Sequence, residues 1–182
     1  MLAAQMAFAM ARRGEHVLVV TLISESHGKL LDHLSGLEFF DESSVGREMV
    51  FLNGYESAQQ SGADGLLELL ASLAREPRPK LLILEGFGTL RTLGLSDLQV
   101  AGFVHQLNSF VSTLGCIALI LEPTPPATTD GPEQALVDGI AMFEVIEHQP
   151  ARLREVQGIG RGLAERIAKA WGEQKAVREI ML

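Results

Sequence analysis

Polar side chains that could take part in chemistry follow two apolar runs of the sequence. Ser24 and Glu25 come soon after the first run, and Glu85 ends the second. The carboxyl ends of buried strands are where α/β proteins bind ligands. A small ligand is therefore expected near these residues and as far as Gly88. The alternative is structural, because a carboxylate at a strand end can instead cap a neighbouring helix or face solvent.

A glycine-rich segment near the C-terminus has residues suited to a different chemistry. Two glycines around Ile159 allow a tight turn with bare backbone, and the Ile159 side chain can fill the junction of two helices. Amide groups that open the second helix would then face outward, ready for a phosphate oxygen. The residues expected to contact phosphates are Gly158, Ile159, Gly160, Arg161, Gly162, Arg166 and Lys169. The alternative is a plain helical hairpin that packs on the sheet.

The charge of the chain is unevenly distributed. The net charge is −8 overall. The first 150 residues contain 8 basic and 19 acidic residues, whereas the last 32 contain 7 basic and 4 acidic ones. An acidic body repels nucleic acid and a basic tail can bind it. The charge pattern therefore assigns any contact with DNA to the tail.

Composition excludes several classes of protein. Hydrophobic residues make up 47% and charged residues 21% of the 182 residues, which is typical of a globular protein and not of a disordered one. The single cysteine, Cys116, has no partner for an internal disulfide, which favours the reducing cytoplasm. No apolar run approaches the ~20 residues of a membrane span, and Met1–Met10 lacks the features of a signal peptide. Neither a membrane partner nor secretion is expected.

Apolar strands alternating with helices predict the fold class. Helices are expected at Leu2–Arg13, Lys29–Leu34, Gly65–Arg75 and Asp97–Leu114. Strands are expected at His16–Leu22, Met49–Leu52, Lys80–Glu85, Cys116–Leu121 and Val137–Val145, with a loop over Pro123–Pro132. In the first helix, the residues that share one apolar face are Leu2, Met6, Ala9 and Met10, and Gly14 ends that helix. The pattern predicts an α/β fold with a mostly parallel sheet flanked by helices.

The order of these segments resembles the RecA-type ATPase fold, in particular its KaiC-like and RadA-like branch. The resemblance covers roughly residues 1–146. The stretches that carry it are Leu2–Ala9 with Arg12–Gly14, similar to the helix after the phosphate loop; Val19–Ser26, similar to the strand that ends in the acidic pair; Leu81–Gly86, similar to the Walker B strand; and Val137–Ile140, similar to a late Asp-Gly-Ile strand.

The resemblance implies roles for three of the polar residues. Glu25 matches the second of two adjacent catalytic acids, a general base, and Ser24 takes the place of the first. Glu85 stands where a magnesium-associated aspartate belongs. The loop G-x-x-x-x-G-K-[ST] and the strand before it have no counterpart in this sequence. ATP and Mg²⁺ are therefore expected as cofactors only if that loop is supplied, and ATP hydrolysis by this chain is not expected.

The tail resembles a second family. Val156–Ile167 is similar to a helix-hairpin-helix motif, and Leu153–Leu182 is similar to that region of RecD-like helicases. Such motifs hold DNA through its backbone with little sequence preference. The two resemblances predict a RecA-like domain over residues 1–146, without its first strand and phosphate loop, and a small helical DNA-binding tail over residues 147–182.

Together these patterns predict a degenerate RecA-like cytoplasmic protein that binds DNA weakly and without sequence specificity, in DNA repair or recombination. Two alternatives remain open. One is an ATP-binding KaiC-like or RadA-like ATPase shortened at its amino end. The other is a non-enzymatic interaction module, in which the sheet pairs with another copy or with a RecA-like partner subunit.

Overall fold

A computed structural model describes residues 2–23, 27–122 and 134–139, together with five residues of the tail, Arg161, Gly162, Glu165, Arg166 and Lys169. The chain divides into two compact units, Met1–Val137 and Asp138–Leu182, and each is treated separately below.

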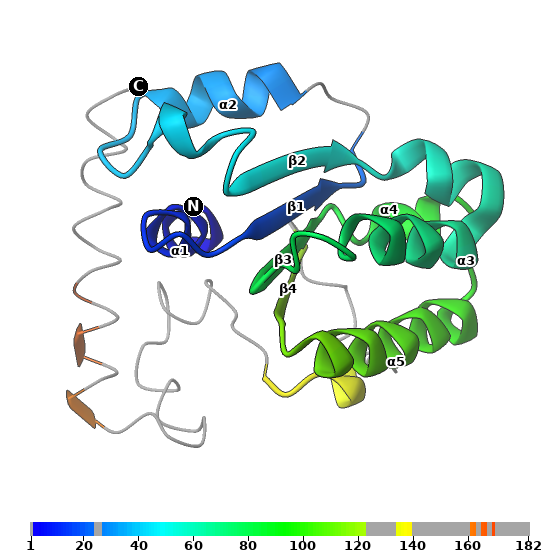
Figure 1. Ribbon diagram of the computed structural model, residues 1–182. Coiled ribbons are helices and arrows are strands. Elements are labelled where there is room, and N and C mark those ends of the chain that lie inside the picture. The colour runs from blue at the N-terminus through cyan, green and yellow to red at the C-terminus, as the bar shows by residue number, and fades with distance from the viewer. Residues whose placement is uncertain are drawn as a thin grey trace. The chain divides into compact units, whose positions relative to one another are not determined.

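The first unit is built around a four-stranded sheet in which all strands are parallel (Figure 1). The strands are β1 (Val17–Thr21), β2 (Met49–Asn53), β3 (Leu81–Glu85) and β4 (Ile117–Leu121). Their order across the sheet is β2-β1-β3-β4, so both central strands lie between parallel neighbours. All four strands expected before residue 122 are confirmed, and the coarse α/β class with them.

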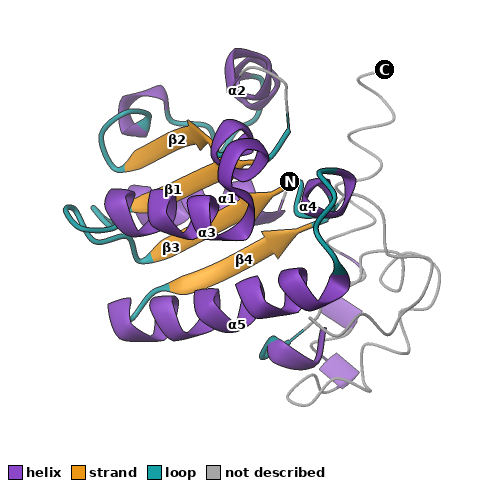
Figure 2. Ribbon diagram, turned by 90° about the vertical axis from the view of Figure 1, so that its right-hand side faces the viewer, coloured by secondary structure: helices purple, strands orange, loops and turns teal. Residues whose placement is uncertain are grey.

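Helices cover both faces of this sheet (Figure 2). They are α1 (Leu2–Ala11), α2 (His27–Ser35), α3 (Tyr55–Leu73), α4 (Thr89–Thr92) and α5 (Asp97–Leu114), with 3-10 turns η1 (Glu42–Ser44) and η2 (Gln134–Leu136). Leu18 and Val20 of β1 pack in one core with α3, α4 and α5, whereas Val17 and Val19 pack in the other with α1 and α2. Because successive side chains of a strand point to opposite faces, a central strand must be apolar throughout.

Helix α5 has the bounds that the sequence predicts, because both ends carry strong local signals. The Ser96 hydroxyl accepts the Gln99 N–H at 3.4 Å, and the Gln99 side chain accepts the Ser96 N–H at 2.9 Å. This capping box begins the helix. Gly115 ends it with φ +64°, in the left-handed region that favours glycine.

Helix α1 buries a different face from the one expected. Ala3, Ala7, Phe8 and Ala11 are buried, whereas Leu2 and Met6 are largely exposed. The small alanine side chains let the helix backbone come close to the sheet. The Phe8 ring fills the remaining space, with its centroid 5.2 Å from that of Phe40. The expected apolar face of Leu2, Met6, Ala9 and Met10 is therefore not the buried one, and of these four only Met10 packs, half-buried, against the core.

Two other elements differ from the expectation. Helix α3 begins at Tyr55, ten residues before the predicted Gly65, and contains a kink at Gly62, where φ is +62° and ψ −146°. Glycine lowers the helical propensity of a segment, so the residues of α3 before the kink were not predicted to be helical. The strand expected at Val137–Val145 does not begin there, because Val137–Gly139 is irregular. The remaining residues of that strand lie outside the described part, as does the whole Pro123–Pro132 loop.

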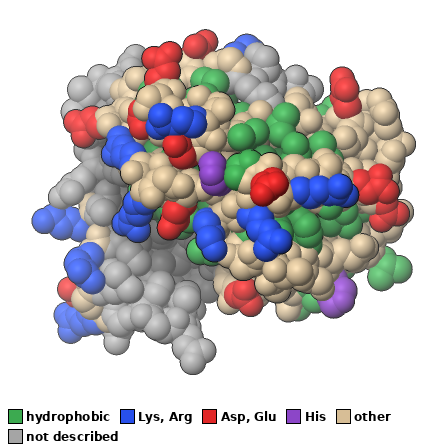
Figure 3. All heavy atoms as spheres, viewed as in Figure 1, with side chains coloured by type: hydrophobic (Ala, Val, Ile, Leu, Met, Phe, Trp, Pro, Cys, Tyr) green, Lys and Arg blue, Asp and Glu red, His purple; other side chains and the backbone are tan. Residues whose placement is uncertain are grey.

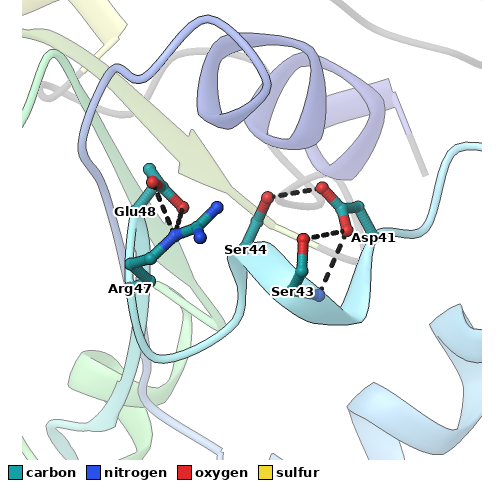
Figure 4. A network of polar contacts seen from close by, with 5 residues as sticks. All are labelled: Asp41, Ser43, Ser44, Arg47 and Glu48. Carbon is teal, nitrogen blue, oxygen red and sulfur yellow. Dashed lines mark hydrogen bonds and ion pairs between the residues drawn. The ribbon is translucent and has the colours of Figure 1, made fainter.

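A cluster of polar side chains orders the connection between α2 and β2 (Figure 4). The Asp41 carboxylate accepts hydrogen bonds from the hydroxyls of Ser43 and Ser44, both at 2.7 Å, and from the Ser43 N–H at 3.1 Å. Arg47 Nε donates to the Glu48 carboxylate at 2.7 Å. The cluster lies at the amino end of β2, so it positions the strand and is not part of the opposite, carboxyl edge.

Replacing Asp41 by alanine should lower the melting temperature near neutral pH. The Ser43 and Ser44 hydroxyls and then the Ser43 N–H lower the pKa of Asp41 from its ordinary value of 3.8. A carboxyl whose pKa is lower in the folded state stabilises the fold above its unfolded pKa, and this contribution is lost as the pH falls through the folded value. The difference between wild type and Asp41→Ala should therefore shrink below about pH 4, measured by circular dichroism. A difference between the two proteins that stays the same from neutral pH to below about pH 4 would contradict this assignment.

Candidate functional site

The carboxyl edge of the sheet brings together residues that are far apart in the sequence. In the register of the strands, Thr21 pairs with Asn53 on one side and with Glu85 on the other, and Glu85 pairs with Leu121. Glu122 follows Leu121 directly. Because all strands are parallel, these positions form one row, at the place where α/β proteins bind ligands.

The Asn53 side chain forms two hydrogen bonds at one end of this row of residues. Its Nδ2 donates to the Ile23 carbonyl at 3.2 Å, and its Oδ1 accepts the Tyr55 N–H at 2.8 Å. The side chain thus holds the exit of β1 against the first turn of α3. Asn53 was not among the residues predicted for this edge, although it ends an apolar run just as Glu85 does.

The segment after β3 is held by two glycines. A Cβ on Gly86, where φ is +77°, would lie 2.7 Å from Ile23 Cγ1. A Cβ on Gly88 would lie 2.6 Å from Glu122 Oε1, so the Glu122 carboxylate lies against the Gly88 backbone. The Gly86 N–H donates to the Leu121 carbonyl at 3.1 Å and ties this turn to β4. The positive φ and the close Ile23 side chain account for glycine at position 86, whereas the atom nearest Gly88 is the end of the flexible Glu122 side chain.

The predicted residues of this edge are only partly described. Glu85 ends β3 with a half-buried side chain, as expected, but Ser24 and Glu25 lie outside the described residues. Over the described ranges no group of three or more His, Cys, Asp or Glu side chains could hold a metal ion. Those ranges also contain no glycine-rich loop with a lysine and a hydroxyl for phosphate. The described residues therefore do not fit a complete Mg²⁺–nucleotide site.

Cys116 is a half-buried residue of the core. Desolvation by burial raises the pKa of its thiol to about 11. Because the thiolate is the reactive form, this side chain is a weak nucleophile at neutral pH. Cys116 therefore acts as a small side chain packed against the core.

The described residues of the tail are helical and exposed. These are Arg161, Gly162, Glu165, Arg166 and Lys169. Arg161 Nε forms an ion pair with Glu165 Oε1 at 2.9 Å, one helical turn away. The three glycine-turn residues expected to contact phosphate, Gly158, Ile159 and Gly160, lie outside the described residues.

On the face that Figure 3 shows, the Lys and Arg side chains of the first unit are interspersed with Asp and Glu side chains and with hydrophobic areas. Helices long and apolar enough to cross a bilayer are absent from the described part of the chain.

The first unit thus belongs to the broad class of α/β proteins with an all-parallel sheet between layers of helices. Comparison with models of known protein families gives no match, and comparison with curated proteins gives none either.

Proposed function

We propose that this protein is a non-hydrolysing RecA-like domain whose tail binds the DNA backbone, acting in DNA repair or recombination. The observation that carries the proposal is the exposure of three cationic side chains, Arg161, Arg166 and Lys169, on helical residues of the tail. They belong to a segment with a net charge of +3, which follows a body with a net charge of −11.

The spacing of these cations suits contact with phosphates. Arg166 and Lys169 are three residues apart, so they are neighbours on one side of a helix. Such contacts are electrostatic and carry no sequence information. Arg161 is already paired with Glu165, which reduces its contribution. Few phosphate contacts and an acidic body together give weak binding.

Binding of the full chain to fluorescent DNA duplexes should therefore be weak and independent of sequence. A plot of log K against log salt should fall with a slope of about −0.9 for each phosphate contacted. If Arg166 and Lys169 each contact one phosphate, the slope is about −1.8. Fluorescence anisotropy with two duplexes of unrelated sequence measures both properties. A slope near zero, or a strong preference for one duplex, would contradict backbone binding.

A further inference from the structure

Strand β4 lies at one end of the sheet, and within the described residues no strand pairs with its outer edge (Figure 1). On the inner side, the Ile117 N–H donates to the Lys80 carbonyl at 3.0 Å, and the Leu121 carbonyl accepts the Gly86 N–H at 3.1 Å. Because backbone groups alternate along a strand, the N–H and C=O groups of Ala118 and Ile120 point to the outer edge.

In the part of the chain that the structure describes, this edge carries none of the features that protect edge strands from association. The five residues Ile117–Leu121 are all apolar and include no charge and no proline. The Ile117 side chain is 55% exposed. At the other end of the sheet, β2 begins beside the Arg47–Glu48 ion pair. Proteins commonly use charges, prolines or covering segments to block such edges, so an unblocked apolar edge indicates a pairing surface.

We propose that β4 pairs with β4 of a second copy of this chain, in antiparallel orientation and centred on Leu119. In this register Ala118 stands opposite the partner's Ile120, and Ile120 opposite the partner's Ala118. These are the residues whose backbone groups point outward, so both pairs can exchange two hydrogen bonds. Ile117 then lies beside the partner's Leu121 on the same face, where its exposed side chain becomes covered.

The charges at the two ends of β4 favour antiparallel pairing, and they make this edge complementary to the same edge of a second copy. Lys80 lies next to the amino end of β4 through its bond to Ile117, and Glu122 follows the carboxyl end. Antiparallel pairing brings the basic end of one copy to the acidic end of the other. Parallel pairing would place like charges together, which is unfavourable.

The oligomeric state of the full chain tests the proposal, together with a matched pair of variants. Sedimentation over a range of concentrations should show a monomer–dimer equilibrium. Ile117→Glu should weaken the dimer at least about tenfold, because it places a negative charge on the paired strand beside the partner's acidic end. Leu98→Glu makes the same change at an apolar residue of α5 that is 83% exposed, and it should leave the equilibrium unchanged.

Amide exchange distinguishes this pairing from other kinds of association. The amides of Ala118 and Ile120 should exchange more slowly as the dimer forms, and they should exchange fast in Ile117→Glu. A chain that stays monomeric at high concentration overturns the proposal. So does a dimer in which these two amides are no better protected than in the monomer, or one that Leu98→Glu weakens as much as Ile117→Glu does.

Discussion

Replacing Arg166 and Lys169 together by glutamine should weaken DNA binding by about sixtyfold near 0.1 M salt. The figure follows if each side chain contacts one phosphate, since each contact contributes about 0.9 to the slope of log K against log salt. The slope itself should become less negative by about 1.8. Anisotropy titrations at several salt concentrations measure both quantities on the same samples.

Two controls separate local contact from the effect of net charge. Arg78→Gln removes one exposed positive charge from the first unit and should change neither affinity nor slope. Glu165→Gln removes the partner of Arg161, so it should strengthen binding, by about eightfold if Arg161 gains one phosphate contact. Equal losses in Arg78→Gln and in the tail variants would mean that the tail is not the DNA-binding part.

Replacing Phe103 by alanine should destabilise the first unit by about 3–5 kcal/mol. Phe103 is fully buried where α5 packs on the sheet, and its ring centroid lies 6.0 Å from that of Phe87. Truncation removes apolar contacts and leaves a cavity that the rigid strands below cannot close. Because domains are stable by only about 5–15 kcal/mol, the loss should be plain in urea unfolding.

Leu98→Ala is the matched control, because it shortens an apolar side chain near the start of the same helix. Leu98 is largely exposed, so its loss should stay within about 0.5 kcal/mol. A Phe103→Ala variant as stable as Leu98→Ala would show that α5 does not pack on the sheet as described. The placement of α5 against the sheet would then be wrong.

The strands were predictable because burial on both faces requires apolar side chains at nearly every position of a central strand. Val17–Thr21 and Leu81–Glu85 are apolar at almost every position, which only a central strand between two helical layers requires. Helix α5 was predictable for another reason, since Ser96 and Gly115 mark its ends by local hydrogen bonding and backbone conformation. The apolar runs and the residues at the helix ends both lie within, or directly beside, the element that they specify.

Other features depend on contacts between distant segments. The buried face of α1 is set by the close approach of Ala3 and Ala7 to the sheet, and a helix rich in apolar residues all round does not reveal that choice. The contribution of Asn53 depends on the exit of β1, 30 residues earlier. Gly88 and Glu122 meet only because β3 and β4 are neighbours.

The α/β class, the four strands, the bounds of α5 and the contrast between an acidic body and a basic tail could all be predicted before the fold was known. These follow from hydrophobic periodicity, capping and charge, which are properties of short segments. The strand order, the row of residues at the carboxyl edge and the edge of β4 that no described strand pairs with depend on the folded chain. Strand pairing joins residues remote in the sequence, and no short segment specifies which of its two edges will be paired.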